Sequence, residues 1–123
     1  MAKMDKKVKE IWVEALRSGS YRQGEGVMCN KIVGERSSHK KFCCLGVLRH
    51  CMFGIDVNPD ELANHFPDAF NNYENYHRSE TKLLDEELEL FGIDYVEQGK
   101  LIDMNDDQGL KFNRIAKYIE ENL

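Results

Sequence analysis

Four cysteines are the residues best suited to carry chemistry in this chain, and three of them lie close together. Cys43 and Cys44 are adjacent, Cys51 follows seven positions later, and Cys29 stands apart. Structural zinc sites usually take paired cysteines separated by two to four residues, and the chain has no such pair. Adjacent cysteines on a strand also point in opposite directions. We therefore expect no metal site, and we expect no cofactor.

Cys43 is the candidate catalytic residue. Helical periodicity after residue 43 places Cys44 and Cys51 on an apolar stripe, and it turns Cys43 away from that stripe. Cys43 also stands at the start of the expected helix, where the helix dipole and free N–H groups favour a thiolate. We therefore expect Cys43 to be the most accessible of the three clustered thiols.

A cysteine hydrolase would need partners for this thiol. Gln23 could donate a hydrogen bond to an oxyanion, and Asn105 or Asp106 could orient a base. The base itself is missing, because His50 lies two turns, or about 10.5 Å, from Cys43 along the helix. We therefore favour a protein without catalytic activity and keep a hydrolase or transferase centred on Cys43 as the alternative.

A second kind of site combines an aromatic ring with side-chain amides. Tyr21 and Gln23 lie beside glycines, which suits the wall of a pocket for a planar, polar small molecule. In the expected fold this wall faces Cys43 and the pair Asn105 and Asp106, so these five residues are our candidate ligand-binding residues. The alternatives are a tyrosine that covers the core beside a glycine turn, and an Asn-Asp cluster that caps the last helix.

Periodicity and turn residues predict the elements that would position these groups. Apolar residues at helical spacing predict four helices: residues 5–19, Cys44 to Met52, residues 81–92, and a C-terminal helix whose start is marked by Asn105, Asp106 and Asp107. Two short apolar runs around a polar turn predict a β-hairpin over about residues 26–44. One or two short strands are expected within residues 93–104.

Two further segments complete the chain. The sequence NPDEL at residues 58–62 predicts the start of a short helix, because asparagine can cap it and proline can occupy its first position. Residues 64–80 are rich in Asn and Tyr without a clear period, and we expect a long ordered loop, which in a small domain tends to be functional.

The length of 123 residues lies in the usual range for a single domain with one hydrophobic core. We therefore expect a single compact α+β domain over residues 1–123, with three or four helices packed on a small antiparallel sheet. The expected core consists of Trp12, Leu16, Cys44, Val47, Leu48, Leu84, Leu88, Phe91, Phe112, Ile115 and Ile119.

Composition and charge exclude some function classes. The chain has 22 acidic and 17 basic residues, a net charge of −5, and its basic residues are dispersed. General nucleic-acid binding is therefore disfavoured, because proteins that bind the phosphate backbone usually present a basic face. No apolar run approaches the roughly 20 residues that span a bilayer, and no signal core is present, so we expect a cytoplasmic protein without disulfides.

Three blocks of the sequence resemble a known class of proteins. The blocks WVEALRSGSYRQG, FCCLGVL and LIDMNDDQGLKFNRIAKYIE are similar to the W-x-x-A-L-R-S-G-x-Y-x-Q-G, C-C-L-G-V-L and L-N-D…F-x-x-I-A-x-Y-I-E blocks of small proteins of tailed bacteriophages and prophages. This chain departs from that pattern at Met104, where leucine is usual, at Arg49-His50, and in residues 64–80. The resemblance implies a phage context and a host-cell cytoplasm, and it implies no particular activity.

These observations together predict a phage-type accessory protein without catalytic activity. We expect it to bind a host protein or a small polar ligand, and counter-defence is one role that such binding could serve. An acidic surface can also occupy a basic groove that normally holds nucleic acid.

Overall fold

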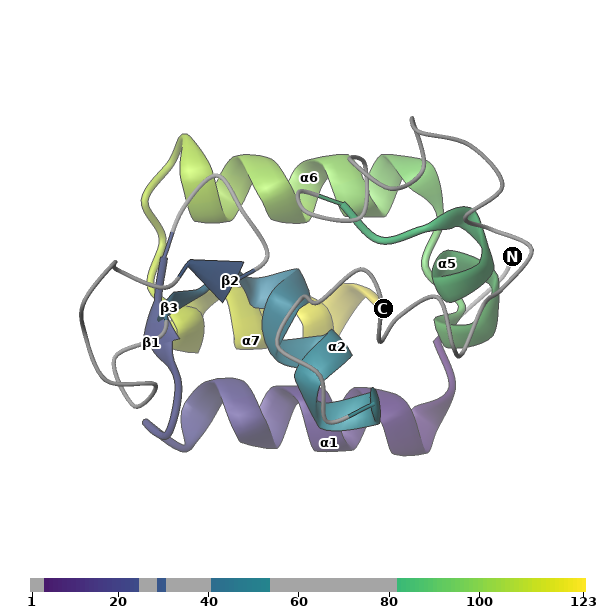
Figure 1. Ribbon diagram of the computed structural model, residues 1–123, viewed down its shortest axis with the longest axis horizontal. Helices are drawn as coiled ribbons and strands as arrows, with labels where there is room; N and C mark the ends of the chain where they lie inside the picture. The colour runs from purple at the N-terminus through teal and green to yellow at the C-terminus, as the bar shows by residue number, and fades with distance from the viewer. Residues whose placement is uncertain (1–3, 25–28, 31–40, 54–81) are drawn as a thin grey trace.

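The fold is seen in a computed structural model that describes residues 4–24, 29–30, 41–53 and 82–123. These residues are mostly helical and include a small sheet (Figure 1). The described helices are α1 (Lys6–Arg17), α2 (Cys44–Phe53), α5 (Asp85–Phe91), α6 (Tyr95–Asp106) and α7 (Phe112–Asn122). The described strands are β1 (Arg22–Gln23), β2 (Cys29–Asn30) and β3 (Lys41–Phe42).

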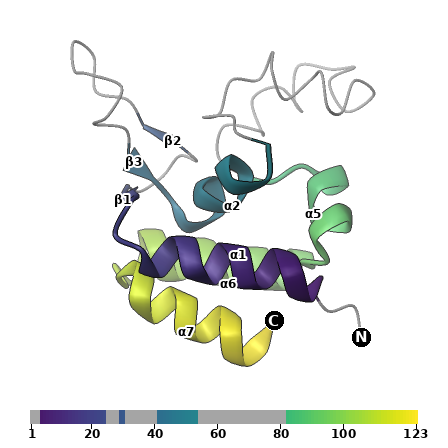
Figure 2. The same cartoon turned by 90° about the horizontal axis from the view of Figure 1, so that it is seen from below.

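Four of the helices form a closed ring around the core. Helix α1 packs against α7 and α2, and α6 packs against the same two neighbours. In Figures 1 and 2, α1 and α6 lie on opposite sides, α2 and α7 cover the two remaining faces, the sheet closes one end, and α5 lies at the other. The strands therefore meet the ends of several helices, and the candidate site lies there.

The core inside this ring is the one that the sequence predicts. All eleven expected core residues are buried, and none exposes more than 8% of its surface. Trp12 is fully buried at the centre, and its indole Nε1 donates to the backbone oxygen of Cys44 at 2.8 Å, so its polar group is satisfied. The helical spacing of apolar residues in α1 places Ile11 beside Trp12, but Ile11 is 44% exposed, so the buried face of α1 is narrower than its apolar face.

The sheet is mixed, which corrects the expectation of an antiparallel one. Its strand order is β1-β3-β2, with β2 antiparallel to β3 and β1 parallel to β3. Gly24 follows β1 and continues the parallel pairing, because its N–H donates to the oxygen of Phe42 at 2.8 Å. A Cβ atom at Gly24 would lie 2.8 Å from the Cβ of Lys41, so only glycine lets the chain approach β3 this closely.

Residues 93–104 were expected to form strands, and this prediction is wrong. They belong almost entirely to α6, whose N-cap Asp94 accepts a hydrogen bond from the N–H of Glu97 at 2.8 Å. The buried face of α6 follows a helical period but includes two polar residues: Gln98, Leu101, Met104 and Asn105. The apolar residues of α6 alone do not follow a helical period, because two of these four buried residues are amides.

The start of the C-terminal helix also differs from the prediction. Asn105 and Asp106 end α6, and α7 begins only at Phe112. By contrast, α5 ends as predicted at Gly92, which has a φ of 75°. The expected short helix at 58–62, the loop at 64–80 and the turn of the hairpin lie outside the described residues.

No helix in the described part of the chain is both long and apolar enough to cross a membrane.

Candidate functional site

Asn105 is the centre of the polar cluster at the sheet end of the molecule. It lies at the end of α6 and is fully buried. Its Oδ1 accepts hydrogen bonds from the N–H of Cys44 at 3.2 Å and from Nε2 of Gln23 at 3.1 Å. Its Nδ2 donates to the oxygen of Gly24 at 2.7 Å and to Oδ1 of Asp106 at 2.8 Å. Both donors and both acceptor positions of the amide are therefore used inside the protein.

Gln23 extends this network to α7. Its Nε2 also donates to the oxygen of Leu110 at 2.6 Å, and its Oε1 accepts from the N–H of Phe112 at 3.1 Å. The second bond caps α7 from a distant strand, because the N-cap residue Lys111 supplies no side-chain cap. We call Gln23 and Asn105 the amide hub, since together they join β1, α2, α6 and α7.

The prediction that Gln23 lies close to Asn105 is confirmed. The hydrogen bonds of the two side chains hold segments of the fold together and do not point to a ligand. Neither amide leaves a buried polar atom without a partner in the described chain. Asp106 is half-buried beside the hub. A ligand that bound Asn105 would have to break internal bonds first.

Cys43 connects β3 to α2 beside the hub, and it is not the most accessible thiol. It is 6% exposed, whereas Cys51 is only half-buried, so that prediction is wrong. The reason is that the first six residues of α2 are all buried, so the helix has no solvent face near Cys43. Cys44 is fully buried, as expected for a core residue.

Burial also controls the acidity of the Cys43 thiol. Desolvation raises its pKa from 9.0 to about 11, although the N–H groups of Gly46 and Leu45 at the helix start act in the opposite direction. The start of the helix therefore lowers the pKa of Cys43 as expected, but desolvation raises it by more. A group with this pKa is a protonated thiol at neutral pH, and it lacks the thiolate that nucleophilic catalysis needs.

Tyr21 lies in an aromatic cluster that the sequence did not reveal. Its hydroxyl is 2.7 Å from Nδ1 of His50 and 3.7 Å from Sγ of Cys51. Its ring packs edge-on against Phe42 at 5.1 Å between centroids, and His50 packs against both rings. No local pattern links Tyr21 to His50, because 29 residues separate them.

Tyr21 and Gln23 also line a pocket of about 250 Å³ at the junction of α1, β1 and α7. Two basic side chains, Arg17 and Lys111, line the same pocket, and its remaining lining residues are Leu16, Gly19, Phe112 and Asn113. No carboxylate is among these lining residues. Cys43, Asn105 and Asp106 do not line it either, so the structure divides the five predicted residues between the pocket and the hub.

The two cations of this pocket differ in their surroundings. Arg17 forms an exposed ion pair with Glu120 at 2.8 Å. The hydrogen bond and the positive charge of Arg17 lower the pKa of Glu120. Lys111 is exposed and has no ion pair within the described residues. Lys111 is therefore the cation more available to a bound anion.

The most deeply buried charges lie elsewhere, between α2 and α5. Arg49 and Glu87 are both fully buried and form a two-pronged pair, with Nε to Oε2 at 2.8 Å and Nη2 to Oε1 at 2.5 Å. Arg49 also donates to the oxygen of Lys82, and Glu87 accepts from the N–H of Leu84 at 2.9 Å. No local sequence pattern indicates this pair, because arginine after an apolar run usually lies at the surface.

Within the described residues, no group of three or more His, Cys, Asp or Glu side chains is arranged to hold a metal ion.

The model of a family described as Domain of unknown function (DUF8296) matches residues 4–88, which is more than half of the chain. The match covers α1, the sheet, α2 and the start of α5. No curated protein and no solved structure matches the chain.

Proposed function

Because this chain belongs to the family described as Domain of unknown function (DUF8296), its role must be inferred from its own residues, and we propose a phage-type accessory protein that binds a small polar ligand without catalysis. The ligand lies in the pocket beside Tyr21 and Gln23. The phage context is supported by the three sequence blocks described above, and counter-defence in the host cytoplasm is the role that this context favours.

The observation that carries this proposal is the composition of the pocket. Two of the five predicted ligand-binding residues line it together with Arg17 and Lys111, and no carboxylate does. Among the described residues, the charged groups that line this pocket are therefore both positive, although the chain as a whole carries a net charge of −5. Its chemistry suits a small molecule that carries a carboxylate or a phosphate, because both accept charge-assisted hydrogen bonds from Lys and Arg.

The state of Cys43 supports binding over catalysis. A hydrolase would need an accessible thiolate with a base in reach, whereas the thiol is buried and its pKa is raised to about 11. The aromatic cluster supplies His50, but its Nδ1 lies at the hydroxyl of Tyr21. No described contact favours the hydrolase alternative.

The test begins with native mass spectrometry of protein expressed in a bacterial host, followed by calorimetric titration of small carboxylates and phosphates. In Lys111→Gln we expect at least about a tenfold weaker affinity, the usual effect of removing a charge-assisted hydrogen bond. The matched control is Lys117→Gln, since Lys117 is exposed on the same helix and does not line the pocket. The proposal fails if no such anion binds, or if both variants bind it equally well.

A further inference from the structure

The negative charge of this protein is concentrated in one short segment. Residues 85–97, here called the acidic segment, contain no Lys or Arg and six carboxylates: Asp85, Glu86, Glu87, Glu89, Asp94 and Glu97. The whole chain has 22 acidic and 17 basic residues, so the rest of it has 16 and 17. The acidic segment alone therefore makes the protein acidic.

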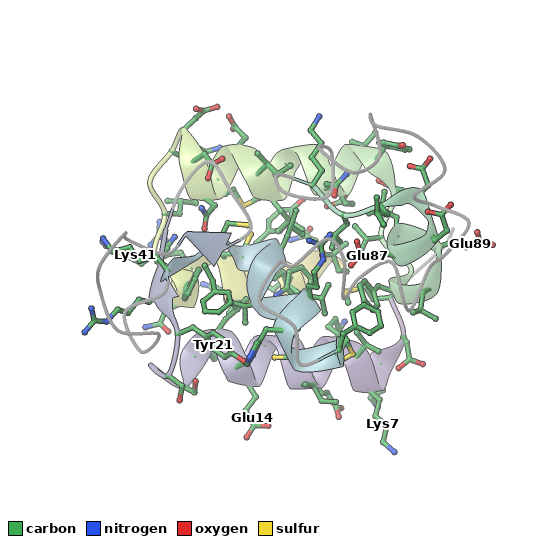
Figure 3. All side chains as sticks on the ribbon, viewed as in Figure 1. Lys7, Glu14, Tyr21, Lys41, Glu87 and Glu89 are labelled. Carbon is green, nitrogen blue, oxygen red and sulfur yellow. The ribbon has the colours of Figure 1, made fainter. Side chains whose placement is uncertain are left out.

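Glu87 is buried and Glu97 is half-buried, whereas the other four carboxylates are exposed, two of them with local hydrogen bonds: Asp85 accepts from Tyr95, and Asp94 caps α6. Glu87 points inward to its buried pair with Arg49, while Glu89 projects outward from α5 (Figure 3). Glu97 accepts from Tyr118 at 2.9 Å and pairs with Lys100 at 3.7 Å. The exposed carboxylates at the end of α5 and the start of α6 are not neutralised by basic residues of their own segment.

The acidic segment also exposes apolar side chains. In the described part of the chain, four large hydrophobic residues are exposed, and three of them lie here: Leu90 at 58%, Tyr95 at 55% and Val96 at 66%. The fourth, Ile11, lies on α1. Single exposed apolar residues are ordinary, but three within seven positions of a strongly charged segment are characteristic of a surface that binds another protein.

A recess beside α5 strengthens this interpretation. Leu90 lines a pocket of about 370 Å³ together with Val8, Met52, Phe53, Phe91 and a single carboxylate, Asp5. Such a pocket can receive an apolar side chain of a partner, which is the usual form of an interaction anchor. The larger groove along α1, of about 480 Å³, is lined instead by charges of both signs and lacks this complementarity.

We propose that the acidic segment is a docking surface for a partner protein whose own surface is basic and carries apolar side chains among its lysines and arginines. The carboxylates attract and orient the partner, and Leu90 and Val96 supply contact area that excludes water. This surface is separate from the ligand pocket, because no residue of the acidic segment lines that pocket.

The probe for this test is a short amphipathic peptide of lysine and leucine, and its binding is measured by fluorescence anisotropy at low and high ionic strength. We expect it to bind the native protein at low salt and to weaken as salt is added. A lysine and glutamine peptide of equal charge should bind at least about tenfold less tightly, because it lacks the apolar contacts.

Two pairs of variants locate the binding surface. The doubles Leu90→Ser/Val96→Ser and Glu86→Gln/Glu89→Gln should each weaken binding at least about tenfold, and the second should also reduce its dependence on salt. The matched controls on α1 are Ile11→Ser and Glu10→Gln/Glu14→Gln, which remove the same kinds of group from another exposed face.

Three outcomes would overturn the proposal: no binding to the native protein, equal losses in the α1 controls, or equal affinity for both peptides. We expect each variant to fold, because all the substituted side chains are exposed. Circular dichroism of each variant checks this. Lys111→Gln should leave peptide binding unchanged, so a failure here is distinguishable from a failure of the ligand pocket.

Discussion

Two of the buried polar regions in the described part of this protein satisfy their polar groups in different ways. At the sheet end, the amide hub of Gln23 and Asn105 is neutral, and its bonds run to backbone groups of three other segments. Between α2 and α5, Arg49 and Glu87 form a buried ion pair that two hydrogen bonds hold together. One region distributes many modest hydrogen bonds, and the other concentrates a strong interaction in one pair.

The difference determines how much stability each region loses when one of its residues is replaced. Burying a charge costs several kcal/mol of hydration free energy, and only a close partner offsets that cost. If the carboxylate of Glu87 is removed, the guanidinium of Arg49 stays charged without compensation, because arginine does not lose its proton in a protein. A neutral amide carries no such cost, so its removal exposes only the hydrogen-bonding groups that it satisfied. The charged pair should therefore be the more fragile of the two.

The largest expected effect comes from breaking the charged pair. Glu87→Gln leaves the buried guanidinium of Arg49 without its carboxylate, and the free energy of unfolding should fall by about 3–5 kcal/mol, measured by urea denaturation. Glu86→Gln is the control, because Glu86 is an exposed neighbour on α5. The double variant Arg49→Met/Glu87→Leu should recover most of the loss. If Glu87→Gln costs no more than its control, the comparison is wrong.

A smaller effect is expected from opening the amide hub. Asn105→Ala removes the partner of two backbone groups, the N–H of Cys44 and the oxygen of Gly24, and because both groups are neutral each should cost about 1–2 kcal/mol. We expect a total loss of about 2–4 kcal/mol in urea denaturation, against almost none for Asn113→Ala at an exposed position of α7. An Asn105→Ala loss larger than that of Glu87→Gln would reverse the order of the two regions.

The contrast between these regions also shows what could be predicted from the sequence. Helices α1, α5 and α7 were predicted because their apolar residues follow a clear period, and the core followed from the same pattern. Helix α6 was missed because Gln98 and Asn105 interrupt its buried face. Gln23 and Asn105 were predicted as site residues because they are polar. Their structural role depends on a contact between residues 82 positions apart, which no local pattern predicts.

Charge and burial explain the remaining differences. The burial of Arg49 has no signal in the local sequence, because the carboxylate that compensates its charge belongs to the distant Glu87. Cys43 was expected to face solvent because the helical period separates it from Cys44, and that argument requires a helix with one exposed side. The start of α2 has none.

The smallest effect concerns Cys43, a neutral group beside the amide hub that becomes charged at high pH. Its pKa is about 11 in the folded protein against 9.0 for an ordinary thiol, so the folded state holds the proton more tightly. This stabilisation is complete below pH 9.0 and is lost as the pH rises towards 11. At 1.36 kcal/mol for each pKa unit, the loss is about 2–3 kcal/mol.

Urea denaturation of the native protein and of Cys43→Ala, followed from neutral pH to about pH 10.5, measures this effect. The native protein should lose more stability over that range than the variant, while other groups whose pKa is raised independently of Cys43, such as Cys51 and Tyr118, are present in both and cancel in the difference. Alkylation of the folded protein should modify the half-buried Cys51 before Cys43. Parallel stability curves, or a Cys43 that reacts first with a pKa below the 9.0 of an ordinary thiol, would show that burial does not control this thiol and would favour the hydrolase alternative.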